Sequence, residues 1–288
     1  MCAILMGMLT EVFGLFRECG SKLGRQERLS WYQLEGFLAG MGKAAEELQI
    51  RDPDLIHIGG VSIFYRGLDT FGPSAVPNFR GTVDLDVLSF GPGSFDYLMD
   101  HMKDKGQIES SKKRTSMGFP DKFTYEVAMP KDNNVGAIHE VKVDLYSASG
   151  RVKFNDRFMT PDAIVLDPPE RLHGLSRQKG MVVVPSLRDS FIIKMDIVAS
   201  SHSGLRDKDQ GDILWMLGMI AKRKERFDDY LEVMMADEGW RTGYKGAGAK
   251  LGELKSLFEG AIGDTTNPVS RKIAEDALRA VRDRMKRS

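Results

Sequence analysis

The period of the apolar residues changes twice along this chain of 288 residues, and this change limits its fold more than any other feature. Up to about residue 50, apolar side chains recur every three to four positions, as they do in helices. From about 54 to 185, short runs rich in β-branched and aromatic residues alternate with Gly and Pro, and the helical period returns after Pro185. The pattern predicts an α+β fold, in which a mixed β-sheet with flanking helices is followed by a helical C-terminal domain.

Two helices are expected in the N-terminal region: one has an apolar face that includes Ile4, and the other starts near Ser30. The expected strands are 55–58, 83–90, 122–129, 137–146, 163–166 and 181–184. We therefore expect one domain over 1–185, including the two helices, and a helical domain over 186–288, with the boundary near Pro185.

Composition excludes several classes of protein. Lys and Arg total 41, and so do Asp and Glu, so the formal net charge is zero and a protein that coats polyanions by charge alone is not expected. The only cysteines, Cys2 and Cys19, lack the spacing of zinc ligands, which favours a reduced, cytoplasmic protein without disulfides. The apolar start reaches Thr10 and Glu11 too early for a membrane span, so no membrane partner is expected.

Two carboxylates share one face of the expected strand at 83–90. Side chains alternate along a strand, so Asp84 and Asp86 lie on one face while the apolar residues between and around them lie on the other. In the run VKVDL at 141–145, the same alternation separates Asp144 from its apolar neighbours. If the two strands lie side by side, three carboxylates converge, and such an oxygen set suits Mg²⁺. A solvated strand face is the alternative for the Asp-x-Asp pattern alone.

A pair of glycines, Gly59 and Gly60, separates an expected strand from a short helical run that contains Ser62. Glycines at such a turn let backbone N–H groups approach a phosphate, the helix N-terminus adds a favourable field, and Ser62 offers one more hydrogen bond. Arg80 and Thr82 stand just before the acidic strand, where Arg80 suits either a triphosphate or a brace for the carboxylates. A simple tight turn and a surface arginine are the alternatives.

In this order, the motifs resemble the nucleotidyltransferase fold of the DNA polymerase β superfamily. They are more narrowly similar to the AbiEii-type nucleotidyltransferase toxins, in which a Gly-Gly turn is followed by an Arg-x-Thr-x-Asp-x-Asp strand. The resemblance covers roughly residues 55–217 and extends to a lysine on a later helix, here Lys194, and to a helix start of the form Lys-Asp-x-x-Asp-Leu, here KDQGDI at 208–213. The chain departs from the pattern in a long loop after residue 67 and in the isoleucine at 213.

Lys194 lies at the edge of the apolar stripe of its expected helix, where a charge directed inward needs a partner. The resemblance implies that its amine points at the nucleotide phosphates; the alternative is a packed stem whose amine reaches water. The resemblance also implies that Asp209 belongs to the site. Helix capping explains at least one of the acids Asp207, Asp209 and Asp212 without chemistry.

The last segment of the chain, 271–288, holds seven basic side chains and three acids. Together with Lys112, Lys113 and Arg114 it could form a surface that faces RNA. Solubility and favourable charge at a helix C-terminus are the alternative explanations.

The residues and the resemblance together predict a Mg²⁺-dependent nucleotidyltransferase that moves a nucleoside monophosphate from an NTP to an acceptor hydroxyl. Two Mg²⁺ ions would clamp the attacking and leaving oxygens. The metal ligands would be Asp84, Asp86 and Asp144, which with Lys194 and Asp209 form the predicted catalytic set. The predicted nucleotide-binding residues are Gly59, Gly60, Ser62, Arg80, Thr82 and Lys194.

The resemblance implies a biological role as well: the toxin of a toxin-antitoxin or phage-defence system, with tRNA or another RNA as acceptor and a cognate antitoxin protein as partner. A small-molecule acceptor is one alternative. A non-catalytic protein that binds nucleotide or RNA on the same fold is the other.

Overall fold

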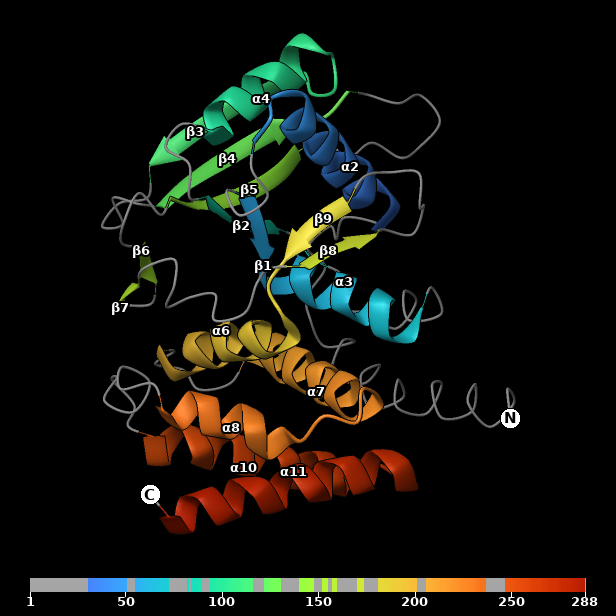
Figure 1. Cartoon of the computed structure of the whole chain (residues 1–288), viewed down its shortest axis with the longest axis vertical. Helices are drawn as coiled ribbons and strands as arrows, with labels where there is room; N and C mark the ends of the chain where they lie inside the picture. The colour runs from blue at the N-terminus through green and yellow to red at the C-terminus, as the bar shows by residue number, and fades with distance from the viewer. Residues whose placement is uncertain are drawn as a thin grey trace. The chain divides into compact units, whose positions relative to one another are not determined.

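The structure is a computed structural model, and it describes residues 31–50, 55–72, 82, 84–89, 94–115, 122–130, 140–147, 152–154, 157–159, 170–173, 181–200, 206–236 and 247–287 (Figure 1). The described residues fall into two compact units. One contains those of 25–65 and 81–189, and the other those of 66–80 and 190–288. We call them the sheet unit and the helical unit. The helix expected at the start of the chain and the strand expected at 163–166 lie outside the described residues.

A five-stranded mixed sheet forms the centre of the sheet unit, with the order β1-β2-β5-β4-β3. The strands are β1 (Leu55–Ile58), β2 (Asp84–Ser89), β3 (Ser110–Thr115), β4 (Lys122–Ala128) and β5 (Glu140–Ser147). β2 and β5 run parallel, whereas the pairs β1–β2, β5–β4 and β4–β3 are antiparallel. The mixed sheet with its flanking helices confirms the α+β class.

One face of this sheet is apolar and is covered by helices. Leu85 and Val87 of β2 and Val143 of β5 are fully buried on this face. Helix α4 (Ser94–Asp104) adds Phe95, whose ring centroid lies 4.8 Å from that of Tyr125. Helix α2 (Trp31–Glu47) contacts α4 in turn. Because these residues take up one face, the alternate residues of β2 and β5 project from the other.

Two short antiparallel pairs complete the described strands: β6 (Val152–Phe154) with β7 (Arg157–Met159), and β8 (Glu170–His173) with β9 (Met181–Val184). Helix α3 (Gly59–Phe71) follows β1 directly, and its residues from Arg66 onward belong to the helical unit.

The helical unit also contains α6 (Leu187–Ser200) from Ser190 onward, α7 (Asp207–Lys222), α8 (Phe227–Ala236), α10 (Ala247–Asp264) and α11 (Pro268–Arg287). Edge-to-face aromatic contacts form part of its core: the ring of Phe227 lies 5.5 Å from that of Phe191 and 5.6 Å from that of Phe258. Asn267 caps α11, because its Oδ1 accepts hydrogen bonds from the N–H groups of Val269 and Ser270. Every described element after β9 is thus a helix, as the sequence predicts. Within the described part of the chain, no helix has both the length and the apolar character that crossing a membrane requires.

Candidate functional site

The acidic residues of β2 and β5 are neighbours on one face of the sheet. In the parallel pairing of these strands, Asp86 is the direct partner of Asp144, and Asp84 is the partner of Lys142. Neighbouring strands lie about 4.8 Å apart, and residues two positions apart on a strand share a face. Asp84, Asp86 and Asp144 therefore start from adjacent backbone positions on the face opposite the apolar core.

The Gly-Gly turn lies against one of these carboxylates. Ile58, the last residue of β1, pairs with Asp86, and α3 begins at the next residue, Gly59. Gly59 has a φ of 63°, and a Cβ placed on it would lie 2.5 Å from Oδ2 of Asp86. Only glycine tolerates both conditions without displacement. The first turn of α3, which contains Gly60 and the buried Ser62, therefore starts beside Asp86.

Asp144 is held by three side chains that the sequence analysis did not assign to the site. Its Oδ1 accepts a hydrogen bond of 2.8 Å from Thr124, its direct partner on β4. Its Oδ2 lies 3.0 Å from Nζ of Lys122 and 3.1 Å from Nζ of Lys142. Burial opposes ionisation, but the hydrogen bonds from Thr124, Lys122 and Lys142 outweigh it and hold the pKa of Asp144 below its usual value. Asp144 is therefore an ionised, buried carboxylate in a positive environment.

All three acids affect the pKa of Tyr146. Burial raises its pKa, and the charges of Asp86, Asp144 and Asp84, in that order, raise it further. Tyr146 follows Asp144 by two positions, so it lies on the same face, and Nζ of Lys122 lies 5.0 Å from the centre of its ring. The carboxylates are thus close enough to act on one phenol group.

A preformed metal site is not present among the described residues, since no group of three or more His, Cys, Asp or Glu side chains there is arranged to hold a metal ion. Oδ1 of Asp144 accepts from Thr124 and Oδ2 is bonded to Lys122 and Lys142, so a metal that bound Oδ2 would have to replace the lysine contacts. The donor set itself fits Mg²⁺, which prefers carboxylate oxygens and completes its coordination with water and phosphate. Metal binding through Oδ2 of Asp144, beside Asp86, therefore requires the lysine side chains, but not the strands, to move.

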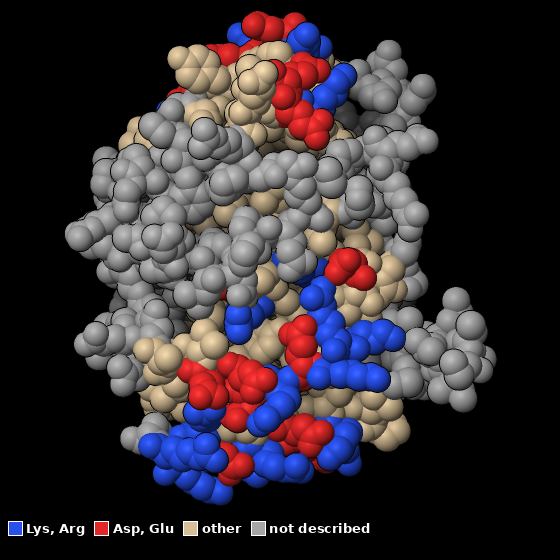
Figure 2. Space-filling view, in the orientation of Figure 1, with Lys and Arg blue, Asp and Glu red and all other residues tan. Residues whose placement is uncertain are grey.

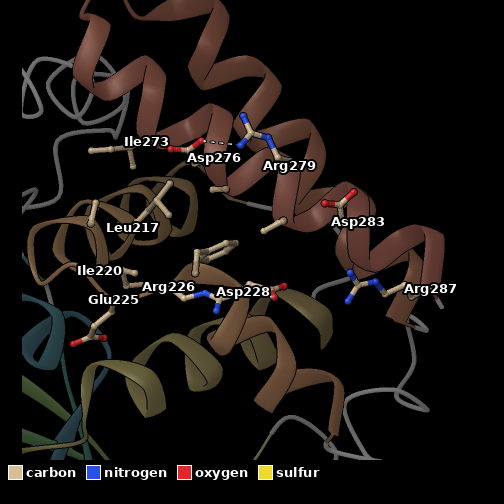
Figure 3. A pocket seen from close by; sticks show the side chains of 14 residues that line it. Leu217, Ile220, Glu225, Arg226, Asp228, Ile273, Asp276, Arg279, Asp283 and Arg287 are labelled. Atoms are coloured by element: carbon tan, nitrogen blue, oxygen red, sulfur yellow. Dashed lines mark ion pairs between the residues drawn. The ribbon is translucent and has the colours of Figure 1, made fainter.

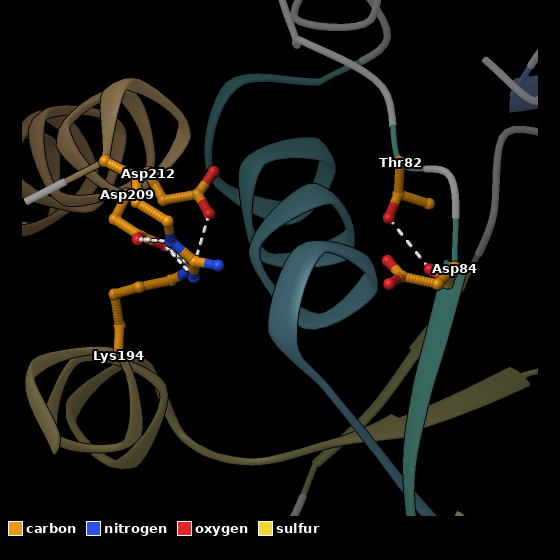
Figure 4. A network of polar contacts seen from close by, with 6 residues as sticks. Thr82, Asp84, Lys194, Asp209 and Asp212 are labelled. Carbon is orange, nitrogen blue, oxygen red and sulfur yellow. Dashed lines mark hydrogen bonds and ion pairs between the residues drawn. The ribbon is translucent and has the colours of Figure 1, made fainter. Parts of the chain in front are cut away.

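Two predicted nucleotide-binding residues precede β2. Thr82 is buried, and its Oγ1 donates a hydrogen bond of 2.8 Å to the backbone carbonyl of Asp84 (Figure 4). This contact fixes the chain at the start of the acidic strand. Arg80 lies outside the described residues.

Lys194, from α6 of the helical unit, takes part in a buried ionic network with α7 (Figure 4). Its Nζ lies 3.1 Å from Oδ1 of Asp209 and 2.7 Å from Oδ2 of Asp212, and Arg206 donates to Asp209 from Nε at 2.6 Å. The side chains of Lys194, Asp209 and Asp212 are 6%, 1% and 1% exposed. The partner that Lys194 was expected to need is thus the pair of acids at the start of α7. Its predicted contact with nucleotide phosphates stays a prediction.

The helical unit also contains a pocket of about 580 Å³, formed by the end of α7, the start of α8 and one side of α11 (Figure 3). Apolar side chains such as Leu217 and Phe227 line it together with charges of both signs. Asp276 and Arg279 in its lining form an ion pair of 3.5 Å. The mixed charges give the pocket no preference for an anionic ligand.

Comparison with known proteins adds little to these observations. No family model matches the chain, and no curated protein does. An antigenic nucleotidyltransferase-like protein from Paracoccidioides brasiliensis is similar in structure, with a TM-score of 0.44 and 17% identity over 67% of this chain and 78% of that one. The Megavirus polyadenylate synthase has a TM-score of 0.33 and 10% identity over 85% of this chain and 48% of that one. Neither name refers to AbiEii-type toxins, so that narrower resemblance stays a prediction.

Two of the four site residues that sequence reasoning missed could have been found by strand alternation. Lys142 precedes Asp144 by two positions, and Tyr146 follows it by two, so strand alternation alone places both on the acidic face. Lys122 and Thr124 alternate in the same way along β4, but assigning them to the site requires the order and register of the strands.

Proposed function

We propose that this chain is a Mg²⁺-dependent nucleotidyltransferase that moves a nucleoside monophosphate from an NTP to an acceptor hydroxyl. The observation that carries the proposal is the pairing of β2 with β5, in which Asp86 faces Asp144 and Asp84 lies two residues away on the same side. Three carboxylates at adjacent positions on one sheet face are the donor set that the proposed metal needs.

In the proposed reaction, the acceptor oxygen bonds to the α-phosphorus, the bond from this phosphorus to pyrophosphate breaks, and the hydroxyl proton leaves to water. Asp84, Asp86 and Asp144 would hold the metal, which when bound would lower the pKa of the acceptor hydroxyl and neutralise phosphate charge. Gly59 keeps the turn after β1 free of a side chain beside Asp86. The N–H groups of the first turn of α3 are the proposed phosphate donors, with Ser62.

The resemblance also implies roles for Arg80, Thr82, Lys194 and Asp209. These roles are part of the proposal. The same holds for the finer biology: two metal ions, a toxin of a toxin-antitoxin or phage-defence system, an RNA acceptor such as tRNA and a cognate antitoxin. A small-molecule acceptor remains the alternative within the same reaction.

A non-catalytic nucleotide-binding protein is the second candidate function, and the contacts of Asp144 favour it. Lys122 and Lys142 occupy the carboxylate that the metal would need. If these contacts never open, no metal would bind Oδ2 of Asp144, and a bound nucleotide would not be transferred. Titration calorimetry with each NTP and Mg²⁺, combined with a pyrophosphate-release assay, separates the two functions, because a binder gives heat without product.

The Asp84→Asn variant tests the proposal. With NTP and total RNA, its rate of pyrophosphate release should fall below that of the wild type. Loss of a residue that hydrogen-bonds to a metal ligand typically costs about 10–100-fold, and the loss here should be larger because Asp84 is a proposed ligand itself. Its thermal unfolding should match that of the wild type, since Asp84 is half-buried at the solvent face. Asp264→Asn, at an exposed position of α10, is the matched control.

Turnover by Asp84→Asn at the wild-type rate would remove this residue from the metal site and with it the proposed reaction. The toxin proposal has its own readout: expression of the wild type should arrest growth and expression of Asp84→Asn should not. Equal growth of both strains would contradict a toxin role while leaving nucleotidyl transfer to the assay above.

A further inference from the structure

Two lysines reach one carboxylate oxygen from different strands. Lys142 comes from β5, two positions before Asp144, and Lys122 comes from β4, where it pairs with Tyr146. Both ammonium groups lie within 3.1 Å of Oδ2 of Asp144. The side chain of Asp144 is only 6% exposed, whereas those of Lys122 and Lys142 are 25% and 49% exposed. The lysines therefore reach inward from the solvent edge to a buried charge.

The charges around Asp144 would allow one divalent cation to replace the two lysine ammonium groups. An ionised carboxylate that is buried needs a compensating charge, and the lysines supply it in this structure. Two ammonium groups carry the same formal charge as one divalent cation. A metal that replaced them at Oδ2 would leave the balance at Asp144 unchanged, and Thr124 would still donate to Oδ1.

Lysine is suited to such an exchange. Its ammonium is a strongly hydrated point charge on a flexible stem, whereas an arginine would grip the carboxylate with a planar, two-pronged guanidinium. The released ammonium groups would stay on the acidic face, because Lys142 is the cross-strand partner of Asp84 and Lys122 lies over Tyr146. An anion bound there would be within their reach.

We propose that Lys122 and Lys142 are exchange residues, which hold Asp144 while the site lacks metal and bind the triphosphate of the nucleotide once a divalent cation has taken Asp144. This inference rests on the proposed nucleotidyl transfer and adds two phosphate-binding residues to it. It also explains why the carboxylates are in register although no metal group is preformed among the described residues.

The test uses the full chain with both lysines replaced, Lys122→Met with Lys142→Met, and two binding measurements. Calorimetric titration with Mn²⁺ alone should show at least about tenfold tighter binding than the wild type, because the competing ammonium groups are gone. Titration with a non-hydrolysable NTP analogue at saturating Mg²⁺ should show at least about tenfold weaker binding, because two charged hydrogen-bond donors are lost. Lys112→Met, at an exposed position of β3, should change neither.

The opposite signs distinguish exchange from a structural role, since a damaged fold weakens both affinities. If the double variant fails to fold, Lys142→Arg replaces it: the guanidinium should hold Asp144 more firmly and weaken Mn²⁺ binding. Unchanged Mn²⁺ affinity in these variants, with metal binding and transfer intact in the wild type, would overturn the inference and leave the proposed function standing. A wild type that neither binds Mn²⁺ with nucleotide nor transfers would instead contradict the proposed function.

Discussion

At the scale of single residues, Gly59 connects the Gly-Gly turn to the acidic strand. Its backbone has a φ of 63°, and the space where its Cβ would be is filled by the carboxylate of Asp86. The sequence predicted a turn that could approach a phosphate. The structure adds that this turn lies close to Asp86, a proposed metal ligand. No local pattern contains that contact, because it depends on the pairing of β1 with β2.

We predict that Gly59→Ala destabilises the fold by about 1–2 kcal/mol, the cost of a left-handed conformation with a Cβ. Because the new methyl group must also displace Asp86, pyrophosphate release should fall by more than the folded fraction does. Urea denaturation and the release assay measure the two effects. Gly252→Ala is the control: a Cβ there meets nothing within 4 Å in the middle of α10, so it should stabilise by about 0.5–1 kcal/mol. Equal behaviour of the two variants would contradict the close approach.

At the scale of elements, the strands show which patterns the sequence reveals. β1, β2, β4 and β9 lie where apolar or alternating residues predicted them, within one residue at each end. β3 was missed because its sequence, SSKKRT, has no apolar residue. It lies at the edge of the sheet and is mostly exposed, so its strand state comes from pairing with β4 rather than from its own side chains.

The division into domains shows a similar limit. The boundary predicted near residue 185 stays a prediction, and the compact units divide within α3 as well as near the start of α6. Gly67 of α3 lies against Trp215 of α7 within the helical unit, so closely that a Cβ on it would lie 2.6 Å from Nε1 of Trp215. Such a contact joins distant parts of the chain, so the period of apolar residues cannot predict it.

The buried network of Lys194 joins two helices, α6 and α7, and predicts a measurable dependence of stability on pH. Burial acts to raise the pKa of Asp209, but Lys194 and Arg206 outweigh it, so its folded pKa lies below the usual 3.8. Because the pKa of Asp209 is lower in the folded than in the unfolded chain, its ionised carboxylate stabilises the fold fully at pH values above the unfolded pKa. That contribution is lost as the pH falls below about 3.8 through the folded pKa.

Asp209→Asn should therefore lower the free energy of unfolding at pH 7 by about 3–5 kcal/mol, or less to the extent that Asp212 keeps Lys194 paired. The difference from the wild type should shrink as the pH falls below about 3.8. Urea denaturation between pH 7 and pH 3 checks this, with the exposed Asp264→Asn as control. A variant of unchanged stability whose turnover alone is lost would instead support the catalytic role that the resemblance implies.

At the scale of the whole molecule, basic and acidic residues are equal in number. The sequence left two explanations open for the basic residues of 271–288: a surface that faces RNA, or solubility with favourable charge at a helix C-terminus. Five basic residues of α11 form ion pairs: Lys272, Arg279, Arg282, Arg284 and Lys286. Figure 2 shows basic and acidic atoms side by side on this surface. Arg284, only 16% exposed, lies 3.1 Å from Asp228 and joins α11 to α8. These pairs favour the explanation by packing and solubility for five of the basic residues of α11, and the surface that faces RNA stays a prediction.

The zero net charge of the chain and the ion pairs of α11 together predict weak binding to polyanions. Nonspecific affinity comes from basic side chains that neutralise phosphates and release counterions, and five bases of α11 already have acidic partners. We expect the full chain to elute from heparin at or below about 0.15 M salt, where screening acts over about 8 Å. The variant Arg282→Gln with Glu259→Gln, which removes an ion pair of 2.8 Å without changing the net charge, should elute at the same salt. Strong retention that this variant reduces would show that α11 contacts the polyanion; unchanged early elution would mean that an RNA acceptor must be recognised elsewhere than on α11.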